Sequence, residues 1–238
     1  MKTIGVLGGL GPQATMDFEA RVHAVSQKLI TQRVNTGYPP MVVYYYRHAP
    51  VVVDEHMHPI FPIQIDPRLL DAAAHLGTMA DFLVITSNGI HMLQPLVEEA
   101  SGCKVLSMVD ATLEEVKRRG LRRVGAIVFA GTGVYKDPLE RRGLECLTIT
   151  EEMQRRLDAA IDAYDEGKHG IEQRGAALDA VNRLRAQGTD GIIMGCTEVP
   201  LLLRPMPGEA GQVDEADAPD LINPIQLLAE AAVRHAMH

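Results

Sequence analysis

The 238-residue chain is 46% hydrophobic and carries a formal net charge of −8, with a sequence pI near 5.6. Nucleic-acid-binding proteins normally present a basic face, so this charge argues against nucleic acid as a partner. No window approaches the roughly 20 apolar residues that a membrane span needs. The three cysteines, Cys103, Cys146 and Cys196, form no close pair, which argues against a disulfide framework or a zinc site. The N-terminus lacks the apolar run of a signal peptide, and we therefore expect a cytoplasmic protein.

Short apolar runs alternate with helical periodicity along the chain, which is typical of a parallel α/β sheet. The first predicted strand is TIGVLGG, followed by a helix over residues 13–32, and the second is PMVVYYY. The next stretch, HAPVVVDEHMHPIFPIQIDP, has no helical pattern and indicates an excursion over a site. A helix over residues 67–76 then leads to the predicted strand DFLVITSN, which ends in small polar residues.

The second half of the chain repeats this plan. A strand and glycine turn like those of TIGVLGG are predicted at RRVGAIVFAGT, and helices over residues 150–166 and 171–187 precede the strand TDGIIMGCT. When ADFLVITSN is aligned with TDGIIMGCT, Asp81 matches Asp190 and Ser87 matches Cys196. The parallel between the opening strands of the two halves favours a duplication.

The predicted fold is therefore α/β, with two pseudo-symmetric, doubly wound (Rossmann-like) parallel-sheet domains. We expect the first domain to comprise residues 1–108 plus 221–238, and the second residues 109–220. Ligands of open α/β sheets bind at the carboxyl ends of the strands. We therefore expect the active site in the cleft between the domains, with Ser87 facing Cys196.

Cys196 is the candidate reactive thiol. It follows a predicted strand and precedes Thr197, Glu198 and the helix start EVPLLL, where backbone N–H groups and a helix N-terminus stabilise a thiolate. Free cysteine is more often an inert, buried, small hydrophobic residue. Cys103 and Cys146 fit that description, because neither has a polar cluster around it.

Two other motifs suggest cofactors. GLGPQA matches the dinucleotide fingerprint, but the acidic residue expected at the end of the second strand is missing. A turn that brings backbone N–H groups to a small anion is the plainer interpretation. His56 and His58 stand beside Glu55 like metal ligands, but no third ligand is evident. We expect neither a metal nor another cofactor.

The sequence IIMGCTEVPLL resembles the second signature of the aspartate/glutamate racemase superfamily. IGVLGGLGP is similar to the N-terminal strand and glycine turn of its aspartate racemase branch, and TSNGIH stands where that family has a Cys-Asn-Thr-x-His pattern. Further agreement in GTGVY, AYDEGKHG and LINPIQLLAEA extends the resemblance over nearly the whole chain.

This resemblance implies a PLP-independent amino-acid racemase that transfers a proton between the two faces of the substrate Cα, commonly as a homodimer. Its substrate would be a small amino acid or carboxylate, with Cys196 and Ser87 acting on opposite faces. His91, one helical turn after Ser87, either tunes the site or has a capping or packing role, and Glu198 would also tune the site. The substrate-binding residues implied are Gly9, Glu55, Asn88, Gly89, Ile90, Thr132, Lys168 and Thr197.

Gly89 stands where the family pattern has Thr, and two other departures from that pattern bear on the chemistry. Ser87 stands where the family has its first catalytic cysteine, and a hydroxyl without a neighbouring base is a poor proton acceptor. Glu55 stands where a family arginine would bind the distal carboxylate of aspartate, and a carboxylate there would repel an acidic substrate. Three interpretations remain: racemisation, a one-sided carbanion reaction of Cys196 such as decarboxylation or isomerisation, and non-catalytic binding of small carboxylates.

Overall fold

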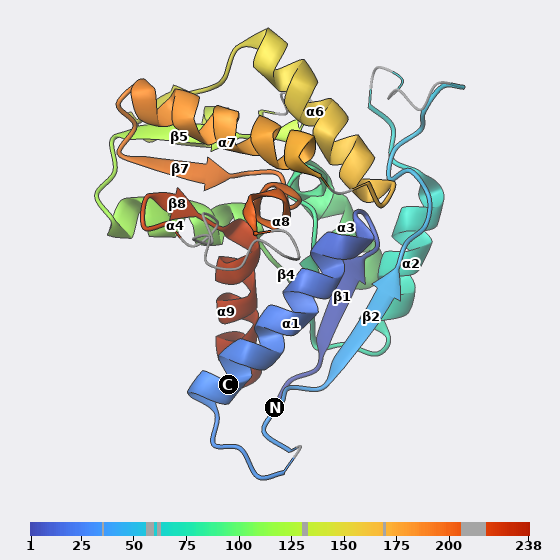
Figure 1. Ribbon diagram of the computed structural model, residues 1–238. Coiled ribbons are helices and arrows are strands. Elements are labelled where there is room, and N and C mark those ends of the chain that lie inside the picture. Colours follow the sequence, from blue (N-terminus) through green and yellow to red (C-terminus); the bar gives the residue numbers. More distant parts are fainter. Residues whose placement is uncertain (35, 56–59, 61–62, 130–132, 169, 206–217) are drawn as a thin grey trace. The chain divides into compact units, whose positions relative to one another are not determined.

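The computed structural model describes the chain from Met1 to His238 except residues 35, 56–59, 61–62, 130–132, 169 and 206–217. The chain divides into two compact units, one of Met1–Met108 with Ile225–His238 and the other of Val109–Pro224. Each unit contains a four-stranded parallel sheet with helices packed on it (Figure 1). The α/β fold predicted from the sequence is therefore confirmed.

In the first unit the strand order is β2-β1-β3-β4. Alternate residues of the central strands point to opposite faces of the sheet. Ile4 and Val6 pack with α1 and α9 on one face, whereas Leu7 packs with α2 and α3 on the other. The elements of this unit are β1 (Ile4–Gly8), α1 (Pro12–Leu29), β2 (Met41–Tyr45), α2 (Pro67–Gly77), β3 (Phe82–Ile85), the 3₁₀ helix η1 (Gly89–Leu93), α3 (Gln94–Ser101), β4 (Val105–Leu106) and α9 (Pro224–Ala236).

The second unit has the strand order β6-β5-β7-β8, which is the order of the first unit repeated. Helices α6 and α7 lie side by side over one face of this sheet (Figure 1). The elements are α4 (Met108–Arg118), β5 (Arg123–Ile127), α5 (Lys136–Glu140), β6 (Glu145–Leu147), α6 (Glu151–Asp165), α7 (Ile171–Ala186), β7 (Gly191–Met194), α8 (Val199–Leu203) and β8 (Leu221–Ile222).

The boundary near the C-terminus differs from the expected one. Strand β8 pairs in parallel with β7, so Leu221–Ile222 completes the second sheet. The first unit accordingly resumes at Ile225 and not at Leu221. A two-residue strand carries no periodicity from which its partner could be predicted.

Asp81 and Asp190 occupy equivalent positions, as the sequence alignment of the two halves predicts. Asp81 directly precedes β3, and its Oδ2 atom accepts a 2.6 Å hydrogen bond from the N–H of Thr3, just before β1. Asp190 directly precedes β7, and its Oδ2 atom accepts from the N–H groups of Arg122 and Arg123 at 2.9 and 2.8 Å. Each aspartate thus ties the start of its own strand, β3 or β7, to the start of the neighbouring strand, β1 or β5. This shared contact supports the duplication.

Candidate active site

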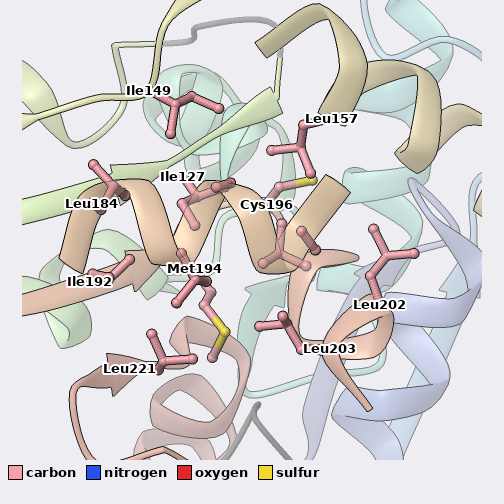
Figure 2. Close-up of a cluster of buried hydrophobic side chains, with 14 of the residues drawn as sticks. Ile127, Ile149, Leu157, Leu184, Ile192, Met194, Cys196, Leu202, Leu203 and Leu221 are labelled. Atoms are coloured by element: carbon pink, nitrogen blue, oxygen red, sulfur yellow. The ribbon is translucent and has the colours of Figure 1, made fainter. Parts of the chain in front are cut away.

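The candidate thiol lies at the end of β7, within the core of the second unit. Cys196 is only 6% exposed and belongs to an aliphatic cluster with Ile127 and Leu157, which Figure 2 shows around it. The preceding Gly195 allows this close packing, because a Cβ atom there would lie 3.0 Å from the carbonyl oxygen of Ile127. The strand end therefore holds the thiol in a largely apolar environment.

One polar group interrupts this environment. The Cys196 thiol donates to Oε2 of Glu198 across 3.0 Å, and the Thr197 hydroxyl donates to the same oxygen across 2.9 Å. All three side chains are buried. Burial raises the pKa of the Glu198 carboxyl, while the two donated hydrogen bonds oppose that rise. A carboxylate that accepts two hydrogen bonds is therefore the direct partner of the thiol.

This environment corrects the thiolate predicted from the sequence. Burial, followed by the negative charge of Glu198, raises the pKa of Cys196 well above its ordinary value. Helix α8, which begins at Val199, has only five residues and does not offset these effects. In this arrangement Cys196 is a protonated thiol that is ready to donate, and Glu198 is the group that can take its proton.

Asp165, at the end of α6, is a neighbour that the sequence did not suggest. Although the residue is exposed, partial desolvation and the Glu198 charge raise the pKa of its carboxyl to about 7. Its charge also contributes to the raised pKa of Cys196. Asp165 lies far from the GCTE motif in the sequence, and a carboxylate at a helix end has an ordinary solvated role, so no local pattern identified it.

In the first unit, the end of β3 is fixed by a buried threonine pair. The hydroxyls of Thr15 and Thr86 hydrogen-bond at 2.9 Å, and Thr15 Oγ1 also accepts from the N–H of Gly9 at 2.9 Å. Gly9 has φ = 79°, and a Cβ atom there would lie 2.6 Å from the carbonyl oxygen of Tyr46. The turn after β1 is thereby held against the residue that precedes Ser87.

Ser87 itself follows directly and is half-buried. In the part of the chain that the structure describes, its hydroxyl makes no hydrogen bond with another side chain. Its carbonyl oxygen lies 2.8 Å from Nδ1 of His91. The position equivalent to Cys196 therefore carries a hydroxyl to which no described side chain hydrogen-bonds, and the nearby His91 ring contacts the Ser87 carbonyl and not the hydroxyl.

His91 contacts two backbone groups. Its Nε2 atom accepts a 3.0 Å hydrogen bond from the N–H of Met108, the first residue of α4, and its Nδ1 atom faces the Ser87 carbonyl. The imidazole is 9% exposed. Of the two roles left open by the sequence, the capping role is present at the N–H of Met108. The other ring nitrogen contacts the backbone of Ser87.

The other expected site residues have different local environments. Asn88 is buried, and its carbonyl accepts from the His91 N–H at 3.1 Å, whereas a Cβ atom on Gly89 would meet nothing within 4 Å. Ile90 packs into the core of the first unit. Glu55 is exposed, and Lys168 is exposed and paired with Glu166. Thr132 lies outside the described residues, as do His56 and His58.

The two remaining cysteines have different surroundings from Cys196. Cys103 is half-buried, with its Sγ atom 3.5 Å from the carbonyl oxygen of Ala80. Cys146 lies on β6, where burial raises the pKa of its thiol to about 11. It lines a cavity of about 470 Å³ with Lys136 and Arg155, and none of the described site residues lines that cavity. We therefore do not assign the cavity to the candidate site.

No group of three or more His, Cys, Asp or Glu side chains in the described residues is placed to hold a metal ion. Within the same part of the chain, no helix is both long enough and apolar enough to cross a membrane.

The protein belongs to the class of duplicated α/β proteins, because its two units repeat the same parallel strand order. Ser87 and Cys196 lie at equivalent positions, after the third strand of each unit. The family model of the Asp/Glu/hydantoin racemases matches residues 7–232. The chain therefore belongs to the Asp/Glu/hydantoin racemase family, and the resemblance seen in its motifs is confirmed.

Individual relatives agree with this assignment. The chain is 24% identical over 221 residues to the broad specificity amino-acid racemase RacX of Bacillus subtilis, covering 90% of this chain and 92% of that protein. Its fold matches a putative Asp/Glu racemase from Yersinia pestis with a TM-score of 0.72 and 21% identity, each chain covered completely. An aspartate racemase homologue from Pyrococcus horikoshii matches with the same TM-score, 20% identity and complete coverage of both chains.

Proposed function

We propose that the protein is a cofactor-independent amino-acid racemase in which Cys196 and Ser87 act on opposite faces of the substrate Cα. The observation that carries the proposal is the buried thiol of Cys196, which donates to the Glu198 carboxylate at the end of β7. Membership of the racemase family supports the same reaction class.

On the Cys196 face the thiol can act either as an acid or as a base. As an acid, the thiol transfers its proton to the substrate carbanion, forming a C–H bond and leaving a thiolate. As a base, Cys196 must first lose its proton, and Glu198, 3.0 Å away, is the acceptor in position to take it. The resulting thiolate then removes the α-proton. A positioned acid–base group of this kind contributes typically about 10²–10⁴-fold to a rate.

On the Ser87 face the chemistry is weaker. A serine hydroxyl needs an adjacent base to act as a proton acceptor, and none of the described side chains hydrogen-bonds to it. We propose that Ser87 supplies or receives the proton through water. Forward and reverse rates would then differ strongly between the two enantiomers.

Substrate contacts follow from the same proposal. Backbone N–H groups around Asn88 and Gly89, with the Thr132 and Thr197 side chains, would bind the α-carboxylate and stabilise the carbanion, as an oxyanion hole does. Gly9 would shape the turn beside them, and Lys168 would approach from the loop after α6. With Glu55 at the position of the family arginine, we propose side chains other than aspartate, in keeping with the broad specificity of RacX. A cytoplasmic homodimer remains part of the proposal.

The one-sided alternative is favoured by one observation: no described side chain hydrogen-bonds to the Ser87 hydroxyl. A carbanion formed by decarboxylation or isomerisation needs only one proton donor, and the protonated thiol of Cys196 suits that role. The alternative predicts that protons exchange at Cα without inversion.

Proton NMR in deuterium oxide separates these functions. The protein is incubated with single L- and D-amino acids that have acidic, basic and apolar side chains, and loss of the α-proton signal and inversion are followed together. We expect both, and we expect Cys196→Ser to abolish both while Cys146→Ser retains them. Exchange without inversion would favour the one-sided reaction. If no amino acid exchanges, the racemase proposal fails.

A further inference from the structure

One contact at each ring nitrogen of His91 determines which of the two nitrogens carries the proton. The backbone N–H of Met108 can only donate, so Nε2 must be the nitrogen with the lone pair. The carbonyl of Ser87 can only accept, so Nδ1 must carry the hydrogen. Only the neutral Nδ1–H tautomer satisfies both groups. An imidazolium could not accept from Met108, and the opposite tautomer would satisfy neither contact.

Both partners of the imidazole occupy special positions in the chain. Met108 is the first residue of α4, and the N–H groups at a helix start have no partner within the helix. It is also the residue at which the chain leaves the first unit, because the second unit begins at Val109. Its side chain is fully buried in the core of the first unit. His91 therefore accepts a hydrogen bond from the first N–H of α4, at a residue whose side chain is held in the core.

The second partner is the candidate site itself. The Ser87 carbonyl and the Asn88 N–H belong to one planar trans peptide, in which the C=O and N–H bonds point in opposite directions. The hydrogen bond from Nδ1 to the Ser87 oxygen consequently fixes the direction of the Asn88 N–H as well. One side chain thus sets both the peptide after β3 and the first N–H of α4.

We propose that His91 is a positioning residue, which as the neutral Nδ1–H imidazole holds the Ser87–Asn88 peptide in a fixed orientation relative to Met108. This inference rests on the proposed racemase function for its catalytic consequence. His91 does not exchange a proton with the substrate. Its contribution is to orient the backbone at the Ser87 half of the site.

Two amide variants separate the two contacts. In His91→Asn, the side-chain NH₂ lies near the position of Nδ1 and can still donate to the Ser87 carbonyl. In His91→Gln, the side-chain oxygen reaches the position of Nε2 and can still accept from Met108. Both variants lose one hydrogen bond and some buried ring area, so we expect similar falls in Tm. A misplaced catalytic group costs up to about 10²-fold in rate, and we expect kcat/KM of His91→Gln to lie about 10- to 100-fold below that of His91→Asn.

Equal losses of kcat/KM in the two variants would make His91 merely structural and overturn the proposal. The second measurement is ¹⁵N NMR of the histidine ring in the unmodified protein, which requires no turnover. We expect a protonated Nδ1 and an unprotonated Nε2 at neutral pH, and His91→Ala identifies the signals. An Nε2–H tautomer or an imidazolium at neutral pH would overturn the proposal even in an active enzyme. If the tautomer is as expected but no amino acid exchanges, it is the racemase function that fails.

Discussion

The Sγ atom of Cys196 lies 3.0 Å from Oε2 of Glu198, and both side chains are buried. The carboxylate serves as acceptor for the thiol proton, and its charge also raises the pKa of that thiol. A change at Glu198 should therefore alter both the ionisation of Cys196 and the catalytic rate.

We expect Glu198→Gln to make Cys196 easier to ionise but the enzyme slower. The amide can still accept from Thr197 but carries no charge, so the midpoint, the pH at which half of Cys196 is thiolate, should fall. Because the amide cannot take the thiol proton, α-proton removal by Cys196 should fall about 10²-fold. The midpoint is measured from the thiolate ultraviolet absorbance, as a difference from the Cys196→Ser protein. Glu152→Gln, an exposed carboxylate on α6, is the control, and an unchanged midpoint in Glu198→Gln would contradict the pairing.

Replacing Ser87 by cysteine should equalise the two faces of the substrate. Ser87 is half-buried, so the larger sulfur atom can be accommodated. A thiol is much more acidic than a hydroxyl and needs no adjacent base to ionise partly near neutral pH. We expect Ser87→Cys to accelerate inversion by about 10²-fold or more, measured by polarimetry or chiral chromatography. Ser87→Ala should keep exchange on the Cys196 face and lose inversion. Equal inversion rates for Ser87→Cys and Ser87→Ala would remove Ser87 from the reaction.

The features predicted from the sequence were those that repeat along the chain. Apolar runs and helical periodicity predicted β1, β2, β3, β5 and β7 and the long helices α1, α2, α6 and α7 to within a few residues, but not the short elements α3, β4, α5 and β6. The match of Asp81 with Asp190 correctly related the two halves. Strand β8 was missed as part of the second sheet because two residues have no period. The family was identified from short motifs, because these preserve residue type and spacing together.

The electrostatics of the site could not be predicted in the same way. The sequence places Glu198 two residues after Cys196, but not the direction in which its side chain turns. That direction, together with burial, reverses the expected sign of the pKa change at Cys196. Similarly, the Glu198 charge raises the pKa of Asp165 although the two residues are far apart in the sequence. Contacts between distant segments are a property of the folded chain, and no local pattern encodes them.

Asp165 should make the protein less stable as the pH rises. Its carboxyl titrates at about 7 in the folded protein, against a reference value of 3.8. Between these values the folded state binds more protons than the unfolded state, so the free energy of unfolding falls until the pH passes about 7. Asp165→Asn should leave Tm unchanged near pH 4 and raise it at pH 8. Since Asp165 is exposed, solvent screening limits the gain to about 1 kcal/mol or less.

The control for Asp165 is Asp179→Asn. Asp179 is an exposed carboxylate that pairs with Arg156 at 2.6 Å, and its loss should give no gain in Tm at pH 8. Thermal unfolding at the two pH values measures both variants. If Asp165→Asn is no more stable than the parent protein at pH 8, the raised pKa assigned to Asp165 is wrong.

Two glycines of the candidate site should respond oppositely to alanine. At Gly9, φ = 79° is strained for any other residue, and the new Cβ atom would lie 2.6 Å from the Tyr46 carbonyl oxygen. We expect Gly9→Ala to lower the free energy of unfolding by about 2–4 kcal/mol, measured by urea denaturation. Gly89 has open space around its Cβ direction, so Gly89→Ala should change stability by about 0.5 kcal/mol or less. A loss of activity in Gly89→Ala would then reflect impaired substrate binding, whereas a loss in Gly9→Ala would reflect distortion of the turn after β1. Equal stability of the two variants would contradict the turn geometry.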